Sequence, residues 1–431
     1  MSEAKADKAS SRCFRLVCAD WEWELVEALL CQEGYQFRKL QGIPWARELL
    51  SGPKALGSSL AAEFGLIYIQ DKASLLPPWC LDPAPGSRIL DLCASPGGKS
   101  GFLAQLTGPQ GLVLANEPGG RRFELLRRNM AQLNLPQVIC SAWEGQKLPL
   151  PDERWPGILL DAPCSGWGTA DKHPRVLKLW QGKKLTPLLK LQQELLSVAG
   201  RLLAPGGSLL YSTCTTNVEE NEAQALWAAE KLGLELEVLS EPPGFALDEL
   251  QDPAARGCLR INGPGSGCQS FFLARLRKPE TSSGPADQGQ GAYFAEAAAS
   301  CELEPGLEDF PGSLHRLPQG RIRLKGERVF FQPLQATEAL PEQLADQGLY
   351  LGRKKGSGLR FWPRARLLLP SAEKQAQDVW HVEQLQSLQQ LLSGQSLPCK
   401  STQKQLGLYW RDLPLGWLTV KGGRVLWTDK G

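Results

Sequence analysis

Two cysteines of this chain each follow a short apolar run beside residues that suit covalent chemistry. Cys164 lies in Asp161–Gly166 (DAPCSG), and Cys214 lies in Tyr211–Thr216 (YSTCTT). The apolar runs predict strands, and the carboxyl ends of neighbouring parallel strands meet at one edge of a sheet. A thiolate at that edge can act as a nucleophile, and a second thiol can carry a proton. An inert buried thiol is the usual alternative for a single cysteine.

A glycine-bearing turn upstream predicts a ligand site. In Asp91–Lys99 (DLCASPGGK) a predicted strand ends, Pro96-Gly97-Gly98 turns, and a helix begins. Glycines let a ligand approach the backbone, and a helix N-terminus offers free N–H groups. The spacing matches neither GxGxxG nor GxxxxGK[ST]. Glu117 ends the next predicted strand, where an acid suits the ribose hydroxyls of an adenosine ligand. A structural turn with a surface acid is the alternative.

The polar residues around the cysteines have both functional and structural interpretations. Asp161 can accept a hydrogen bond from an exocyclic amine, and Pro163 leaves a carbonyl free to accept another. Lys172 can meet a phosphate or a base, or can simply be solvated. Asn217 can cap a helix whose first turn contains Glu219 and Glu220, so we expect a structural role first for both acids.

The elements that must position these residues alternate between strands and helices over residues 81–278. Predicted strands are Arg88–Leu92, Leu112–Asn116, Val138–Ser141, Ile158–Asp161, Ser208–Ser212 and Ser270–Leu276. Predicted helices are Gly98–Leu106, Arg121–Leu133, Leu185–Leu203 and Glu219–Leu232, with Pro205–Gly207 ending the third. This alternation predicts an α/β fold with a mostly parallel sheet covered on both faces.

The flanking regions predict smaller units. Before residue 81, a helix is expected at Trp21–Leu30 and a strand running into a helix at Gly65–Leu76. Glu280–Gly291 is rich in Gly, Ser and Pro and predicts a linker. Short strand-like runs separated by Gly and Pro follow in 292–431 and predict an α+β region.

Composition limits the class of protein. The 431 residues suffice for two or three domains, and 42% hydrophobic with 22% charged residues is a globular balance. A net charge of +2 indicates that any nucleic-acid binding must use local patches. No apolar run reaches the ~18 residues of a membrane span, and the polar N-terminus has no signal-peptide core, so we expect a cytoplasmic protein. The twelve cysteines form no CxxC pair and the three histidines are far apart, so no metal is expected.

These motifs resemble the Nol/Nop/Sun family of RNA 5-methylcytosine methyltransferases, in its RsmF-like branch. The resemblance runs from about Gly65 to Lys278, and the segments that carry it are YIQDKASLLP, DLCASPGGKS, LANEPGGRR, DAPCSGWGTADKHP, APGGSLLYSTCTTNVEENE and QSFFLARLRK. It implies a Rossmann-like S-adenosylmethionine methyltransferase sheet over residues 81–279. It also implies an RNA-binding-type region at 1–80 and, after a linker at 280–291, a C-terminal α+β, PUA-like RNA-binding region at 292–431. The implied substrate is small-subunit ribosomal RNA, free or in a ribosomal subunit, and we expect a monomer.

The resemblance also implies residue roles. Cys214 would be the nucleophile and Cys164 would assist product release. S-adenosylmethionine would contact matching positions, namely Cys93, Ala94, Ser95, Pro96, Gly97, Gly98, Lys99, Glu117, Glu144 and Asp161. Three departures stand out: the family's RVNTLK-type N-terminal segment is not found, Glu144 replaces the usual aspartate, and the basic-tyrosine-proline ending is absent.

The chemistry of a cytosine C5 methylation explains the need for two thiols. Carbon 5 is a poor nucleophile until a thiolate adds to carbon 6. Asp161 would hold the N3/N4 edge of the base, and Cys164 would act as base or relay when the C5 proton leaves. The target base must be presented away from its stack, from single-stranded or locally opened RNA.

A basic and aromatic stretch predicts where RNA binds. Its cations include Arg353, Lys354, Lys355, Arg360, Arg364 and Arg366, and its rings are Tyr350, Phe361 and Trp362. Cations for phosphates beside rings for bases suit RNA, and a solvated basic face is the alternative.

Three other functions remain open. A DNA cytosine methyltransferase would use Cys164 as the nucleophile, although the Cys214 motif argues against it. A tRNA cytosine-5 methyltransferase and a non-catalytic RNA-binding ribosome-assembly factor are the other two.

Overall fold

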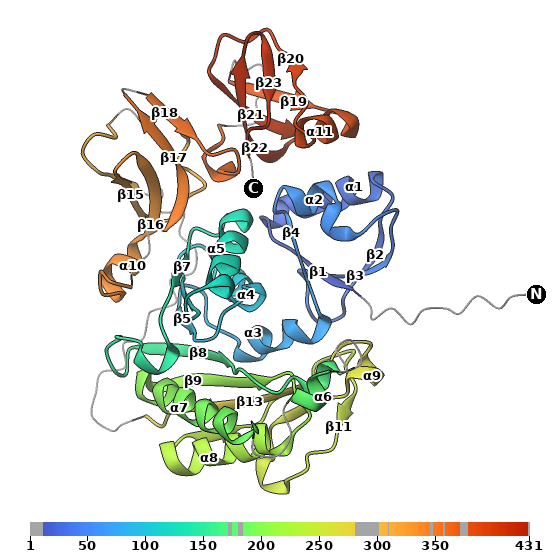
Figure 1. Ribbon diagram of the computed structural model, residues 1–431, viewed down its shortest axis with the longest axis vertical. Helices are drawn as coiled ribbons and strands as arrows, with labels where there is room; N and C mark the ends of the chain where they lie inside the picture. Colours follow the sequence, from blue (N-terminus) through green and yellow to red (C-terminus); the bar gives the residue numbers. More distant parts are fainter. Residues whose placement is uncertain are drawn as a thin grey trace, which may run out of the picture.

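The structure is a computed structural model that describes residues 12–170, 175–179, 184–280, 301–308, 310–344, 348–356, 358–370 and 378–429. In these residues the strands form four sheets, of which the longest has nine strands (Figure 1). The predicted linker lies outside the described residues apart from Glu280, and so does Lys172. None of the described helices is long and apolar enough to cross a membrane.

The nine-stranded sheet forms the centre of the protein. Its parallel part runs in the order β9 (Leu203–Thr213), β8 (Trp155–Asp161), β5 (Arg88–Asp91), β6 (Leu112–Asn116) and β7 (Val138–Ser141). Antiparallel strands continue from β9 as β13 (Phe271–Arg277), β12 (Leu259–Ile261) and β11 (Leu247–Asp248), and β10 (Glu235–Glu237) pairs with β13. The predicted Rossmann-like sheet is therefore present, with an antiparallel extension on one side.

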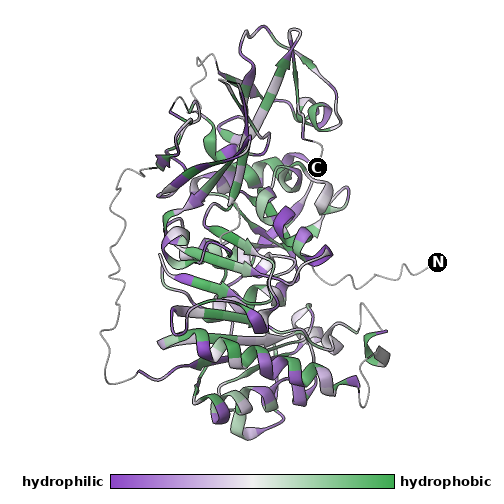
Figure 2. Cartoon of the chain, turned by 60° about the vertical axis from the view of Figure 1, so that its left-hand side comes forward, coloured by the Kyte–Doolittle hydropathy of each residue, from purple (hydrophilic) through white to green (hydrophobic). Residues whose placement is uncertain are grey.

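Alternation along the strands assigns the helices to two faces of this sheet. Leu90 and Leu114 belong to a core with α7 (Thr186–Leu202) and α8 (Glu222–Leu232). The neighbouring residues Ile89 and Val113 belong to a core with α3 (Leu76–Leu81), α4 (Gly98–Thr107) and α5 (Arg121–Leu133). Successive side chains of a strand point to opposite faces, so both faces need an apolar cover. Figure 2 accordingly shows largely hydrophobic strands in the middle and helices of mixed colour below them.

One predicted break is wrong. Pro205–Gly207 does not separate helix from strand, because β9 begins at Leu203 directly after α7 and includes these residues. The segment is irregular, and the register between β8 and β9 shifts where Trp155 faces Leu203 and Gly157 faces Ser208. Backbone hydrogen bonds of Gly206 and Gly207 to Lys278 keep it in the sheet. Pairing with the continuation of β13 therefore overrides the local turn signal.

The N-terminal part forms a second sheet in the order β2-β3-β1-β4. Its elements are β1 (Cys13–Leu16), α1 (Trp23–Gln32), β2 (Gln36–Lys39), β3 (Ala46–Ser51), α2 (Leu60–Glu63) and β4 (Ile67–Gln70). The predicted helix and the predicted strand-to-helix segment are confirmed as α1 and as β4 followed by the 3₁₀ turn η3 (Lys72–Leu75) and α3. β4 leads through η3 into α3, which packs on the nine-stranded sheet. The end of β4 therefore lies beside the glycine turn at Pro96–Gly98.

Two five-stranded sheets make up the described C-terminal part. The first contains β14 (Cys301–Leu303), β15 (Gly320–Lys325), β16 (Arg328–Pro333), β17 (Leu349–Lys355) and β18 (Gly358–Phe361), and α10 (Leu334–Ala339) follows β16. The second contains β19 (Val379–Val382), β21 (Gln405–Trp410), β22 (Leu413–Lys421), β23 (Arg424–Leu426) and β20 (Leu397–Pro398), with α11 (Leu385–Leu392). Short elements that the sequence did not predict include α6 (Val176–Leu179), α9 (Gly263–Ser266), β10 to β12, β14 and β18 to β20.

The second C-terminal sheet packs against the N-terminal part rather than standing apart. Phe64 and Trp427 meet edge to face, with ring centroids 5.4 Å apart. Arg366 forms a buried ion pair with Glu22 at 3.3 Å and donates to the Val17 carbonyl. The first C-terminal sheet lies beside α5 and β7, as Figure 1 shows. Both ends of the described chain are thereby tied into one structure.

Candidate active site

The two predicted cysteines meet at the carboxyl ends of β8 and β9. These strands are parallel neighbours, with Asp161 opposite Ser212. Cys214 directly follows β9, and Cys164 follows β8 by three residues. Their sulfur atoms are 3.3 Å apart, which is hydrogen-bonding distance for thiols. The expected convergence of the two side chains is therefore present.

The surroundings of the two thiols shift their pKa values in opposite directions. The hydrogen bond from Cys164 lowers the pKa of Cys214, and the charge of Lys99 contributes in the same direction against the opposing effects of burial and Asp161. The same hydrogen bond, together with burial, raises the pKa of Cys164 well above its ordinary value. In this arrangement Cys164 keeps its proton and donates it toward a Cys214 thiolate. Cys214 is thus the better nucleophile of the pair.

A half-buried charge pair lies beside the cysteines. Lys99 Nζ lies 2.7 Å from Asp161 Oδ2, and Ser212 Oγ donates to Asp161 Oδ1 at 2.9 Å. Burial alone would lower the pKa of Lys99, but the charge of Asp161 and their hydrogen bond raise it above its usual value. Lys99 therefore stays an ammonium and orients the Asp161 carboxylate, whose remaining lone pairs can still accept from a ligand.

The glycine turn borders a cavity of about 170 Å³. Gly97 has φ +106°, a conformation that favours glycine, and it precedes the first residue of α4. A Cβ on Gly98 would lie 2.8 Å from Tyr68 Cε1 and 3.0 Å from Gln70 Oε1, so no larger residue fits there without movement. Predicted site residues that line the cavity are Cys93, Ala94, Ser95, Pro96, Gly98, Lys99 and Asp161.

Asp91 and Cys93 lie beside this turn, and their surroundings raise the pKa of both groups. Asp91, the last residue of β5, is fully buried and accepts one hydrogen bond from Ser100 Oγ at 2.6 Å, while its other oxygen has no partner in the described residues. Burial raises the pKa of Asp91 to about 7. Burial, reinforced by the charge of Glu117, also raises the pKa of Cys93. The Cys93 thiol therefore stays protonated and is a weak candidate for a nucleophile.

Glu117 and Glu144 differ in placement. Glu117 is nearly buried just beyond β6, where it accepts from the Ser95 backbone N–H at 3.2 Å and pairs with Arg122 at 2.6 Å. Arg122 is exposed, so it can move away from this acid. Glu144 is exposed and pairs with Lys147 at 2.7 Å, and neither of the two acids lines the 170 Å³ cavity. The geometry brings Glu117 to the glycine turn and leaves Glu144 outside.

Gln70 is one of five cavity-lining residues to which our sequence reasoning gave no role. It ends β4, and both polar atoms of its side chain are buried with no hydrogen-bond partner in the described residues. Tyr68, Asp71 and Ser74 line the same cavity from β4 and η3. The available signal was the YIQDKASLLP segment, which carried the resemblance but received no role. An unpaired buried amide that faces a cavity is a candidate ligand contact.

Glu220 holds the two cysteine loops together. Its buried carboxylate accepts from the Ser165 backbone N–H at 2.8 Å, from Ser165 Oγ at 2.5 Å and from Gln192 Nε2 at 3.0 Å. Asn217 Nδ2 also donates to it at 3.3 Å. The expected structural role of this acid is confirmed, and it connects the loop after β8 to the loop after β9.

Two finer expectations on these loops have different outcomes. Asn217 caps the 3₁₀ turn η7 (Val218–Glu220) by accepting from the Glu219 N–H, as predicted. The Pro163 carbonyl is not free, because Gln192 Nε2 donates to it at 2.9 Å.

Three of the predicted RNA-binding residues are exposed on the paired strands β17 and β18, namely Arg353, Lys355 and Arg360, and Arg353 lies opposite Arg360. Lys354 Nζ donates to the Gly306 carbonyl, and Arg360 donates to Thr419 Oγ1 at 2.9 Å. Arg366 and Phe361 are buried, which excludes both from contact with RNA in this conformation.

Comparisons with known proteins match the central region of the chain to ribosomal RNA methyltransferases. A family model described as 16S rRNA methyltransferase RsmB/F matches residues 78–277. Ribosomal RNA small subunit methyltransferase F of Citrobacter koseri is 35% identical over 275 residues, which are 63% of this chain and 55% of that relative. The chain thus spans about half the length of the curated relatives it matches.

Solved structures agree with the fold. A methyltransferase homolog protein from Pyrococcus horikoshii is 30% identical, with a TM-score of 0.54 over 62% of this chain and 86% of its own. NSun6 from Pyrococcus horikoshii is 20% identical, with a TM-score of 0.54 over 63% of this chain and 91% of its own, a likeness that concerns the fold alone.

Proposed function

The chain belongs, through residues 78–277, to the RsmB/F family of methyltransferases, and we propose on this premise that it transfers a methyl group from S-adenosylmethionine to carbon 5 of a cytosine in small-subunit ribosomal RNA. The observation that carries the proposal is the 3.3 Å approach of the Cys164 and Cys214 sulfurs beside the Lys99–Asp161 pair. Methyl transfer to an oxygen or an exocyclic nitrogen needs no such thiol pair. Addition to a pyrimidine ring needs one thiolate, and a second thiol beside it can carry a proton.

The residues around the glycine turn fit the cofactor. The turn presents backbone without Cβ obstruction, the Gln70 amide lacks partners, and Glu117 can accept from ribose hydroxyls once Arg122 moves. The cavity of about 170 Å³ is below the 300–1,000 Å³ typical of small-molecule sites, so its lining must move apart to seat the cofactor. When bound, S-adenosylmethionine supplies the methyl group as a sulfonium electrophile.

The chain's own groups account for the remaining chemistry. The Cys214 thiolate adds to C6 of cytosine, and Asp161, oriented by Lys99 and Ser212, accepts from the N4 amine. Once Cys214 is bonded to carbon, the hydrogen bond that raises the pKa of Cys164 is lost. After C5 has taken the methyl group, Cys164 loses its proton to water more readily, its thiolate accepts the C5 proton, and Cys214 leaves as a thiolate as the ring regains its aromatic form.

Single-cysteine variants test the proposal. We expect Cys214→Ala to abolish methylation of a small-subunit rRNA transcript and to form no covalent complex. We expect Cys164→Ala to accumulate a protein–RNA adduct that survives a denaturing gel. Cys31→Ala, which removes an exposed cysteine on the outer face of α1, is the matched control and should behave as the parent.

The alternatives predict other results. An adduct formed by Cys214→Ala would make Cys164 the nucleophile, as in DNA cytosine methyltransferases. Methylation of a tRNA transcript but not of rRNA would favour a tRNA enzyme. Absence of any methyl transfer by a parent protein that binds both S-adenosylmethionine and RNA would favour a non-catalytic assembly factor.

A further inference from the structure

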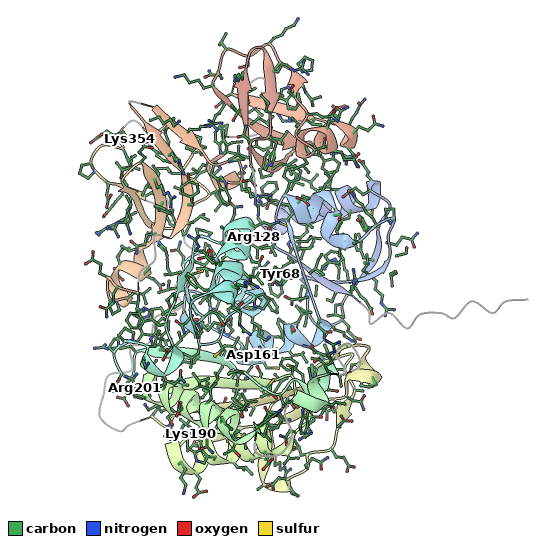
Figure 3. The ribbon with its side chains drawn as sticks, viewed as in Figure 1. Tyr68, Arg128, Asp161, Lys190, Arg201 and Lys354 are labelled. Carbon is green, nitrogen blue, oxygen red and sulfur yellow. The ribbon has the colours of Figure 1, made fainter. Side chains whose placement is uncertain are left out.

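A second, larger cavity lies away from the cysteines. It has a volume of about 640 Å³ and opens between α5 and the first C-terminal sheet. Arg121 and Arg128 line it from α5, and Arg328 and Arg353 line it from β16 and β17. Figure 3 places Arg128 near the middle of the molecule, above Asp161 and below the C-terminal sheets. Two segments about two hundred residues apart in sequence thus contribute to one basic cleft.

The charge of this cleft is unbalanced. All four of these arginines are exposed, and none has an ion pair or a side-chain hydrogen bond with any described residue. Glu124 is the one acid that lines the cavity, and it is already paired with Arg127 at 3.0 Å. Four unpaired guanidinium groups around one cavity repel one another unless an anion joins them. Guanidinium groups bind phosphate oxygens in a two-pronged geometry.

Aromatic rings form a row along the C-terminal wall. Phe330 and Tyr350 have centroids 5.5 Å apart, and Tyr350 and Trp362 have centroids 5.8 Å apart. All three line the cleft, and Tyr350 and Trp362 are only half-buried. Trp362 Nε1 donates to Asp429 at 3.2 Å, which fixes its ring. Rings that are held in place beside cations are the usual platform for unpaired bases.

We propose that this cleft binds a single-stranded segment of the RNA substrate, with phosphates on Arg121, Arg128, Arg328 and Arg353 and a base stacked on Tyr350 or Trp362. The inference rests on the proposed function, which it extends from the reacting cytosine to the neighbouring strand. A duplex hides the faces of its bases and cannot use the rings. Arg121 begins α5 only a few residues after Glu117, so the cleft starts beside the edge of the sheet where the candidate active site lies.

Charge-removing variants test the proposal by salt dependence. The triple variant Arg128→Ala, Arg328→Ala, Arg353→Ala removes three of the four cations. Each phosphate contact to a single strand contributes about 0.7 to the slope of log K against log salt. The triple variant should therefore lower the slope by about 2. If its affinity for a single-stranded RNA oligonucleotide equals that of the parent at 1 M salt, it should bind about 100-fold more weakly than the parent at 0.1 M salt.

A control with the same change in charge separates a local from a general effect. Lys190→Ala, Lys231→Ala, Lys421→Ala removes three exposed cations outside the cleft, and Figure 3 shows Lys190 in the lower part of the molecule, below Asp161, whereas Arg128 lies near the middle. This control should keep nearly the parent slope. Tyr350→Leu should weaken binding about 5-fold or more and leave the slope unchanged, because it removes a ring and no charge.

The outcomes distinguish the cleft from the proposed function. Equal slopes for the two triple variants would overturn the cleft, even if the parent protein methylates RNA. A triple variant that loses binding to the ribosomal subunit but keeps its affinity for RNA would also overturn it, in favour of an acidic protein partner. A parent protein that shows the expected slopes but transfers no methyl group would refute the proposed activity and leave the cleft as an RNA site.

Discussion

Glu220 offers the sharpest test of how the site is held, because one carboxylate joins both cysteine loops. Its side chain is fully buried and accepts four hydrogen bonds, of which two come from Ser165, the residue after Cys164. Glu220→Ala would leave the Ser165 N–H without an acceptor in the interior, and Gln192 Nε2 would keep only its bond to the Pro163 carbonyl. The two loops would still be joined by the hydrogen bond between Ser165 Oγ and Thr215 Oγ1 at 2.8 Å and by that from the Gly168 N–H to the Cys214 carbonyl at 3.0 Å, so the loss would loosen the 3.3 Å approach of the sulfurs rather than separate the loops.

The magnitude follows from the bonds removed. A hydrogen bond to a charged group contributes about 1.5–3 kcal/mol, so the two bonds from Ser165 account for about 3–6 kcal/mol of local stability. Glu220→Gln keeps one acceptor oxygen and should lose about half of that. Since about 1.4 kcal/mol is a factor of ten, the lower estimates correspond to about 100-fold faster local opening for Ala and about 10-fold for Gln.

Hydrogen–deuterium exchange of the peptides around Ser165 and Thr215 measures this opening directly. Glu219→Ala is the matched control, because the neighbouring acid is exposed and its carboxylate has no partner in the described residues. We expect the control to exchange within twofold of the parent. If Glu220→Ala also exchanged at the parent rate, the carboxylate would not be what joins the loops, and the reasoning would be refuted.

Three further perturbations address the thiols and the cofactor cavity. Cys164→Ala removes the hydrogen bond that lowers the pKa of Cys214, so alkylation of Cys214 by iodoacetamide should begin at higher pH than in the parent, and Cys164→Ser should shift it less; an unchanged pH profile would contradict the pairing. Glu117→Ala should weaken S-adenosylmethionine binding by about 1–3 kcal/mol in calorimetry, and equal affinity would exclude the ribose contact. Gln70→Leu should weaken the same binding while leaving thermal stability equal or higher, because the buried amide has no partner to lose; a destabilised variant with normal affinity would assign Gln70 to the fold instead.

Local patterns predicted the central sheet well because its strands and helices need little long-range information. Leu112–Asn116 is apolar up to its last residue and is β6 with those bounds. Arg121–Leu133 has its buried residues at Leu126, Met130 and Leu133, the spacing of one helix face, and is α5 with those bounds. The convergence of the two cysteines followed from the same reasoning, since neighbouring parallel strands end at one edge.

The errors arose where distant partners outweigh local signals. Pro205–Gly207 carries a strong break signal, yet its backbone pairs with Lys278, which local sequence does not reveal. Arg366 reads as a surface cation in a basic stretch, yet it is buried against Glu22 at the other end of the chain. A basic composition identifies residues that can bind phosphate, whereas only the tertiary contacts show which of them already have a partner.

The same distinction explains why the sequence motifs identified some residues of the site and not others. Cys164, Cys214 and Asp161 stand in strand-end segments whose chemistry is visible in one line of sequence. Gln70 reaches the cavity from a different sheet, and the residue types around it give no reason to expect an amide without a partner. Buried polar groups are normally paired. Where an amide and a set of exposed arginines lack partners among the described residues, a small polar ligand fits the first and a polyanion the second, which are the two substrates that the proposed methyl transfer to RNA requires.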